Sequence, residues 1–257
     1  MKIISLGWGT QSFTLAAMVA LGELEAVDFA VHADTRHESS LTYDFAARWT
    51  EWLSSHGVKV VTVRAANTDI INPYGGVLIP AFTAGKDGKN GQIRRQCTYD
   101  WKIRPMRAWI SAELERRGLR KKPGTVEQWI GISLDEFQRM KQADVKYIVN
   151  RFPLIEMRMT RADCVDWLKK HGLEIPPRSA CVFCPFKSSA DWRQTRAIGQ
   201  DWRAAVEVDE HIRTSRPPNA LYIHPSRKPL ADVDFRTAEE KGQISLWDSE
   251  CEGVCGV

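Results

Sequence analysis

The sequence predicts an α/β protein in which a parallel, twisted sheet is flanked by helices and followed by a mostly helical, cysteine-bearing C-terminal region. Two observations predict this class. Short apolar segments of strand length alternate with longer segments of helical periodicity, which favours parallel strands joined by right-handed crossovers. Glycine, hydroxyl and acidic residues follow the apolar segments, at the strand ends where such sheets bind ligands. The chain of 257 residues, 43% of them hydrophobic, is long enough to bury a full core.

The order of elements follows from these periodicities. The expected elements are a strand at residues 3–4, a helix over about 11–21, a strand over 27–33, a helix to about 53, a strand over 58–63, a helix over about 99–116 and a strand over 128–132. Residues 67–91 are rich in Gly, Asn, Pro and Lys and predict a lid or a binding loop. A composition change near 152 predicts a boundary between an α/β domain, 1–152, and a helical region, 153–257.

The turn between the first strand and the first helix predicts an anion site. Gly7 and Gly9 let an anion approach the main chain closely. The free N–H groups at the start of a helix, together with its dipole, favour negative charge there. Hydroxyl and amide side chains in the same turn add donors: Ser5, Thr10, Gln11 and Ser12. The turn is neither a Walker loop nor a G-x-G-x-x-G dinucleotide loop.

Clustered cysteines predict a metal or redox site. Cys181 and Cys184 form a C-x-x-C pair, whose two thiolates reach one zinc ion or one iron–sulfur cluster. Cys97 and Cys164 are the candidates for the remaining ligands. Cys164 has an alternative, because it lies in a helix expected to begin with a cap at Thr160 and to bury apolar neighbours.

Two further groups of polar residues are candidates for contacts to phosphate or sulfate. Lys102 and Arg104 lie in a basic segment beside Cys97, and guanidinium and ammonium groups bind such oxygens well. Asp135 and Arg139 follow the strand over 128–132, so they point to the same rim as the glycine turn. A solvated basic face, or a capping and ion-pairing role for the second group, is the alternative.

The segment from Ser5 to Ser12 resembles the pyrophosphate-binding loop of the PP-loop ATP pyrophosphatase superfamily (adenine nucleotide alpha hydrolase-like), commonly S-G-G-x-D-S. The order of the later segments resembles the PAPS reductase-like branch: Arg-Arg-Gln-Cys97, Gly131-Ile-Ser-Leu-Asp135, the segment around Cys164, and Cys181-Val-Phe-Cys184-Pro. Three loop positions depart from the pattern. Gly7 replaces a serine, Trp8 replaces a glycine, and Gln11 replaces an aspartate and so brings no charge for holding magnesium.

The resemblance implies a nucleotide-binding first domain and a sulfurtransferase that adenylates its substrate with ATP and Mg²⁺, then transfers sulfur with the help of a [4Fe–4S] cluster. It implies that the nucleotide is held by Ser5, Gly7, Gly9, Thr10, Gln11, Ser12, Asp34, Lys102, Arg104, Asp135 and Arg139, and that Asp34 is also a catalytic residue. It implies that the cluster is held by Cys97, Cys181 and Cys184, with Cys164 as a fourth ligand. A sulfur donor such as a cysteine desulfurase is the implied partner, and the acceptor, a nucleic acid or a nucleotide, stays open.

Two other functions remain open. A sulfonucleotide reductase of the PAPS or APS type would use a cysteine of the C-terminal tail, Cys251 or Cys255, as its nucleophile and a thioredoxin-like reductant. A zinc-stabilised nucleic-acid-binding module would use the basic segments instead. The net charge of +4 permits an anionic ligand or RNA without requiring either. We expect a cytoplasmic protein without a membrane partner, because no signal peptide or spanning apolar run is visible.

Overall fold

The computed structural model describes residues 1–85, 90–237 and 240. Its main sheet has five parallel strands in the order β3-β2-β1-β6-β7. They are β1 (Lys2–Ser5), β2 (Phe29–Asp34), β3 (Val60–Arg64), β6 (Val126–Ile130) and β7 (Ile148–Arg151). The chain runs outward from β1 to β3 and then returns to the other side of β1 with β6. The strand order therefore reverses between β1 and β6, where open α/β sheets place their ligand crevice.

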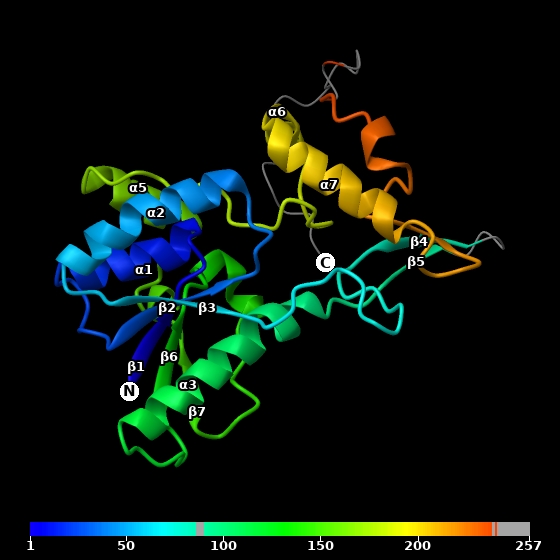
Figure 1. Cartoon of the computed structure of the whole chain (residues 1–257). Helices are drawn as coiled ribbons and strands as arrows, with labels where there is room; N and C mark the ends of the chain where they lie inside the picture. Colours follow the sequence, from blue (N-terminus) through cyan, green and yellow to red (C-terminus); the bar gives the residue numbers. More distant parts are fainter. Residues whose placement is uncertain (86–89, 238–239, 241–257) are drawn as a thin grey trace.

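Helices cover both faces of this sheet (Figure 1). On one face lie α1 (Thr10–Ala20), α2 (Ser40–Ser55) and α5 (Arg161–Lys170), and α3 (Arg104–Arg116) covers the other. Alternate β1 residues serve the two faces, since Ile4 packs with α1 and α2 residues such as Phe13 and Phe45, whereas Ile3 packs with Ile110 of α3. This period of two is what a parallel strand buried on both faces requires.

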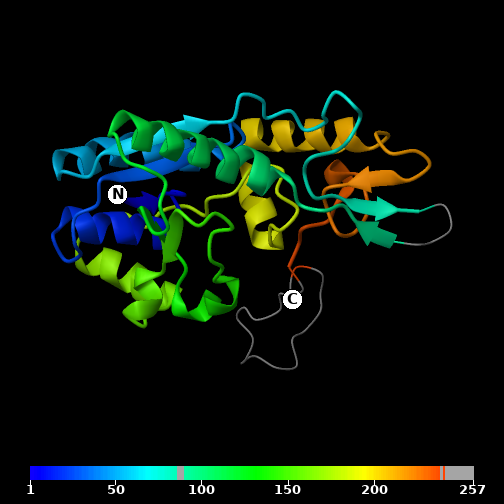
Figure 2. The same ribbon diagram turned by 90° about the horizontal axis from the view of Figure 1, so that it is seen from below.

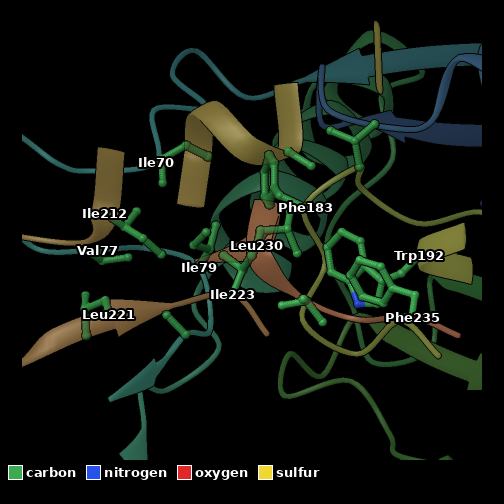
Figure 3. Packing of buried hydrophobic residues seen from close by; sticks show 14 of the residues in the cluster. Ile70, Val77, Ile79, Phe183, Trp192, Ile212, Leu221, Ile223, Leu230 and Phe235 are labelled. Atoms are coloured by element: carbon green, nitrogen blue, oxygen red, sulfur yellow. The ribbon is translucent and has the colours of Figure 1, made fainter. Parts of the chain in front are cut away.

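A second, smaller core lies beside the main sheet (Figure 2). Its three-stranded antiparallel sheet has the order β5-β4-β8, with β4 (Phe82–Ala84), β5 (Asn90–Gln92) and β8 (Ala220–Tyr222). The helices α6 (Ser189–Ala197) and α7 (Gly199–Ile212) and the turn η3 (Leu230–Asp232) complete it. Figure 3 shows Ile79 and Leu221 of this cluster together with Phe183, and Trp192 stacked on Phe235 with 6.0 Å between ring centroids.

The α/β class with a parallel sheet is confirmed, and so are the expected strands and helices of the first 130 residues within a few positions. The helix expected over 99–116 divides into the π-helical turn η1 (Thr98–Ile103) and α3. The capping box that begins α5 is also confirmed, because Thr160 Oγ1 accepts from Asp163 N at 3.2 Å. The strands β4, β5, β7 and β8, the short helix α4 (Pro153–Glu156) and the turn η2 (Leu134–Arg139) were not expected.

The division at residue 152 stays a prediction, and the packing shows how the two parts share their cores. Ile70, Val77 and Ile79 belong to the same buried cluster as Phe183 and Leu230, so the first part of the chain helps to build the second core. Conversely, α5 packs on α1 through Leu168, which lies in the cluster of Phe13. Among the described residues, no helix is both long enough and apolar enough to cross a membrane.

Candidate active site

A cavity of about 960 Å³ opens at the carboxyl ends of β1 and β6, bounded on one side by the start of α1 and on the other by the C-x-x-C loop. Pockets of this size hold nucleotide-sized ligands. Most of the site residues that the sequence predicts line this cavity. The predicted residues that line it are Ser5, Gly7, Gly9, Thr10, Gln11, Ser12, Lys102, Arg139, Cys97, Cys181 and Cys184. A smaller hollow of about 520 Å³ over α3 touches none of them.

The start of α1 has the free N–H groups that the predicted anion-binding turn requires. Gly9 is the N-cap residue, and no side chain caps this helix, so its first N–H groups face the cavity without a side-chain acceptor. Ser12 braces the turn: its Oγ accepts from Gly7 N at 3.1 Å and donates to Gly9 O at 3.2 Å. Within α1 the first turn contains no acidic residue that would repel an anion. The turn therefore presents donors and a helix N-terminus to the cavity.

Trp8 holds this turn on the hydrophobic core. Its φ of 57° lies in the left-handed region, which a bulky residue rarely adopts. The side chain is only 1% exposed and packs against Phe13 and Phe45, with ring centroids 6.4 and 6.2 Å away. Trp8 therefore adopts a backbone conformation that favours glycine. The burial of its large aromatic side chain offsets the strain of this conformation.

The end of β6 lies directly against this turn. A Cβ atom on Gly131 would come within 2.7 Å of Ser12 N and 2.8 Å of Ser12 Cα. These are backbone atoms, so no side-chain movement could relieve the contact. The neighbouring segment continues the contact, since Gln11 Nε2 donates to Ser133 Oγ at 3.3 Å and to Glu136 Oε2 at 3.1 Å. Gly131 therefore permits the close approach that positions the anion-binding turn.

Positive charge dominates the cavity wall. Among the described residues that line it, six are cationic and two acidic: Arg95, Lys102, Arg139, Arg161, Arg178 and Lys187 against Glu136 and Asp191. Lys102 Nζ pairs with Glu38 Oε1 at 3.0 Å, and the side chain of Glu38 is fully buried. Burial lowers the pKa of Lys102, but the Glu38 carboxylate outweighs it, so that the pKa lies above its usual value. Lys102 is therefore cationic at neutral pH.

Three thiols line the same cavity as these cations. Cys181 Sγ lies 3.4 Å from Thr35 Oγ1. The backbone of Cys181 forms an isolated antiparallel β-bridge with that of Glu38. Burial, and next the Glu38 carboxylate, raise the pKa of Cys181 to about 12. Burial likewise raises the pKa of Cys97. Both side chains are therefore neutral thiols at neutral pH in the ligand-free protein.

Two predicted acidic contacts to the nucleotide are not at the cavity. Asp34 is 4% exposed and its carboxylate accepts from Tyr43 Oη at 2.7 Å, Arg64 Nε at 2.8 Å and Arg36 N at 2.8 Å. These donors satisfy the carboxylate within the ligand-free protein, and the expected catalytic and nucleotide-binding role of Asp34 stays a prediction. Asp135 accepts from Arg161 N at 3.0 Å at the start of α5 and is also absent from the described cavity lining.

Arg104 and Cys164 are also placed elsewhere. Arg104 begins α3 as an exposed residue and is not among the described residues that line the cavity. Cys164 is fully buried between Leu15 and Leu154, which fits the alternative of a core residue. Burial raises its pKa to about 12. The structure therefore does not bring Cys164 together with the other three cysteines. The tail residues Cys251 and Cys255 lie outside the described residues.

Several cavity residues had no signal in the sequence that could have singled them out. Thr35, Arg178, Ser179 and Lys187 line the cavity, and Glu38 anchors its wall through Lys102 and Ser179 Oγ, the latter at 3.2 Å. Lys187 lies three residues after Cys184, and this closeness to the C-x-x-C pair is the one sequence feature that indicates a position near the site. Burial lowers its pKa.

The donor set does not form a metal site as it stands. Within the ranges that the structure describes, no group of three or more His, Cys, Asp or Glu side chains is arranged to hold a metal ion. Three thiols that line one cavity are suitable metal ligands in their chemistry. The iron–sulfur cluster, the zinc alternative and Mg²⁺ accordingly stay predictions of the sequence.

Comparison with known proteins gives a weak structural likeness. No family model matches the chain, and no curated protein matches it. Among solved structures, it is similar to the crystal structure of phosphoadenylyl-sulfate (PAPS) reductase from Candida auris in its phosphate complex. The TM-score is 0.42 at 11% identity, over 68% of this chain and 74% of that chain. The α/β class rests on the strand order and pairing of the sheet itself.

Proposed function

We propose that the protein is an enzyme that binds an adenine nucleotide through its phosphates and uses cavity thiols to transfer sulfur to an adenylated substrate. One observation carries the proposal: a single cavity holds an uncapped helix N-terminus, an excess of cationic side chains and three thiols. Helix N-termini and guanidinium groups bind phosphate, and thiols carry sulfur.

Each part of the wall has a task in this proposal. The N–H groups at the start of α1, in the turn that Ser12 braces, hold the nucleotide's phosphates, with Arg139 and Lys102 balancing their charge. Phe183 and Trp101 line the same cavity and limit access of water to the thiols. Gln11 contributes an amide donor where the related loops carry a carboxylate, so this turn binds the phosphates through donors alone.

The reaction has three steps, and reduction of the disulfide that they form restores the enzyme. An oxygen of the substrate attacks the α-phosphorus of ATP, forming the adenylated substrate and releasing pyrophosphate. The terminal sulfur of a persulfide on one cavity cysteine then displaces AMP, and a second cavity thiol attacks the resulting mixed disulfide. This releases the thiolated substrate and leaves a disulfide that an external dithiol reduces. Adenylation matters because AMP is a far better leaving group than hydroxide. The C-x-x-C pair supplies two thiols in one loop.

A sulfonucleotide reductase is the second candidate, favoured by the Glu-Cys-Glu-Gly sequence around Cys251 at the end of the chain. There a tail thiol would attack the sulfur of the sulfonucleotide, forming a thiosulfonate and releasing the nucleotide. A dithiol of the thioredoxin kind would then displace sulfite. The same cationic cavity suits this substrate, because a sulfonucleotide also joins an adenylate to an anionic group.

A turnover assay on Ser12→Ala tests the proposal. The parent enzyme, loaded with persulfide from a cysteine desulfurase, should convert ATP to AMP and pyrophosphate when the acceptor is supplied as bulk tRNA or a nucleotide mixture. Ser12→Ala loses the brace between Gly7 and Gly9, so its affinity for ATP should fall about tenfold. Ser54→Ala is the matched control, because Ser54 is an exposed helical serine whose hydroxyl donates only to Thr50 O, at 2.8 Å, among the contacts described.

The two candidates give different products. Sulfite release from a sulfonucleotide, with no cleavage of ATP, would replace the sulfurtransferase by the reductase. An equal ATP affinity in Ser12→Ala and Ser54→Ala would contradict the placement of the phosphates at the start of α1 under either reaction.

A further inference from the structure

Glu136 is an acidic residue at the predicted phosphate site. Its carboxylate accepts from Gln11 Nε2 at 3.1 Å through Oε2 and from Arg139 Nη1 at 2.5 Å through Oε1. Glu136, Gln11 and Arg139 all line the cavity. The carboxylate therefore occupies two donors that a phosphate in this cavity would use.

The other acidic residue described on the cavity wall has a different role. Asp191 completes the capping box of α6 with Ser188 and pairs with Arg178. Its carboxylate is fixed by the helix terminus that it caps. Glu136 has no such task, because within the described residues its carboxylate contacts only Gln11 and Arg139.

The contact of Glu136 is one that a ligand can displace. The side chains of Glu136 and Arg139 are 29% and 62% exposed, and water screens such a pair strongly. The Glu38–Lys102 pair on the same wall behaves differently, because the Glu38 side chain is fully buried and its separation would leave an unpaired buried charge. Of these two pairs, the one beside the α1 turn is the weaker.

The backbone at Glu136 does not continue a regular helix. The turn η2 is interrupted at Glu136, whose φ of −114° and ψ of 19° are not helical. A carboxylate left in place would repel an incoming phosphate across a short distance. If the side chain moves, the repulsion is removed and both donors become free at the same time.

We propose that Glu136 is a displaceable counter-ion of the phosphate site, a role that rests on the proposed function. In the free protein it holds Gln11 and Arg139 in position at the cavity wall. When the phosphates of a nucleotide or free pyrophosphate enter, Glu136 withdraws and the ligand takes over the two donors. The ligand is an anion with phosphoryl oxygens. Its negative charge must be large enough for it to displace the Glu136 carboxylate.

Calorimetric titration of Glu136→Gln with ATP and with pyrophosphate, each with Mg²⁺ and with EDTA, tests this proposal. The substitution keeps the shape and removes the charge, so both ligands should bind about fivefold more tightly under both conditions, with a smaller gain at high salt. Arg139→Ala should weaken binding by a similar factor, because it removes a donor that the ligand takes over. Asp144→Asn is the matched control, because Asp144 lies in the same β6–β7 connection as Glu136 and also pairs with an arginine, Arg107 of α3. Asp144 is not among the described residues that line the cavity.

Three outcomes would overturn the proposal. Unchanged binding by Glu136→Gln, or the same gain in Asp144→Asn, would show that Glu136 does not compete with the ligand. Weaker binding by Glu136→Gln in Mg²⁺ alone would make the carboxylate a metal ligand instead. If the parent protein binds the ligands but Glu136→Gln binds them no more tightly, only this inference is contradicted. If neither the parent nor Glu136→Gln binds them, both the proposed function and the inference are contradicted.

Discussion

Gly131→Ala should lower the affinity for ATP by about tenfold or more and destabilise the protein by about 1–3 kcal/mol. The added Cβ would lie 2.7 Å from Ser12 N, 2.8 Å from Ser12 Cα and 3.0 Å from Gln11 C. Since all three are backbone atoms, either β6 or the start of α1 must move by several tenths of an ångström. The N–H groups that face the cavity would then lose their alignment. Calorimetric titration with ATP and chemical unfolding measure the two effects.

The backbone of Gly131 makes the test specific. Its φ does not lie in the left-handed region, so alanine meets no conformational penalty there and the effect comes from the contact alone. Gly199→Ala is the control, since its Cβ would lie 3.4 Å from the end of the flexible Arg203 side chain at the start of α7. If Gly131→Ala bound ATP as tightly as Gly199→Ala does, the contact between β6 and α1 would have no part in holding the ligand.

Asp209→Ala should destabilise the protein by about 3–5 kcal/mol, the largest stability effect expected for a single residue outside the cavity. Asp209 is fully buried and accepts from Ile223 N and Leu230 N, both at 2.9 Å, while its carboxylate also pairs with Arg213. Its removal leaves two buried N–H groups and one guanidinium without their acceptor. Urea unfolding followed by tryptophan fluorescence is suitable, because Trp192 and Trp202 lie in or against the same core.

Glu207→Ala is the control for this prediction, because Glu207 is an exposed residue of the same helix, two positions earlier. It should change the free energy of unfolding by less than about 0.5 kcal/mol. A comparable small change in Asp209→Ala would mean that water or neighbouring groups replace the lost carboxylate, and that Asp209 does not join α7 to β8 and η3.

The sequence predicted the strands β1, β2, β3 and β6 of the main sheet, because they are local patterns, and it missed β7. β1, β2 and β3 are apolar segments with turns at both ends, and α1 and α2 have clear apolar faces. The strands β4, β5 and β8 could not be found in this way. Each has three residues, and β8 pairs with β4 across more than 130 residues of chain, so only the tertiary structure defines them.

The sequence predicted which backbone turn and which cysteine motif line the cavity. It did not predict the partners of side chains that can pair in more than one way. The turn at Gly7–Ser12 and the pair Cys181 and Cys184 do line one cavity. Asp34 stands at the correct strand end, but Tyr43 and Arg64 take its carboxylate, and no sequence pattern announces them. Cys164 has the same limit, because a thiol in a helix gives no sign of whether it faces a ligand or Leu15.

A crystal structure of the protein with bound ATP is the most direct test of the central claim. We predict that the phosphates lie within hydrogen-bond distance of the N–H groups at the start of α1, near Ser12, with the thiols of Cys97, Cys181 and Cys184 on the facing wall of the same cavity. ATP bound elsewhere, with the α1 turn free of ligand, would contradict the claim.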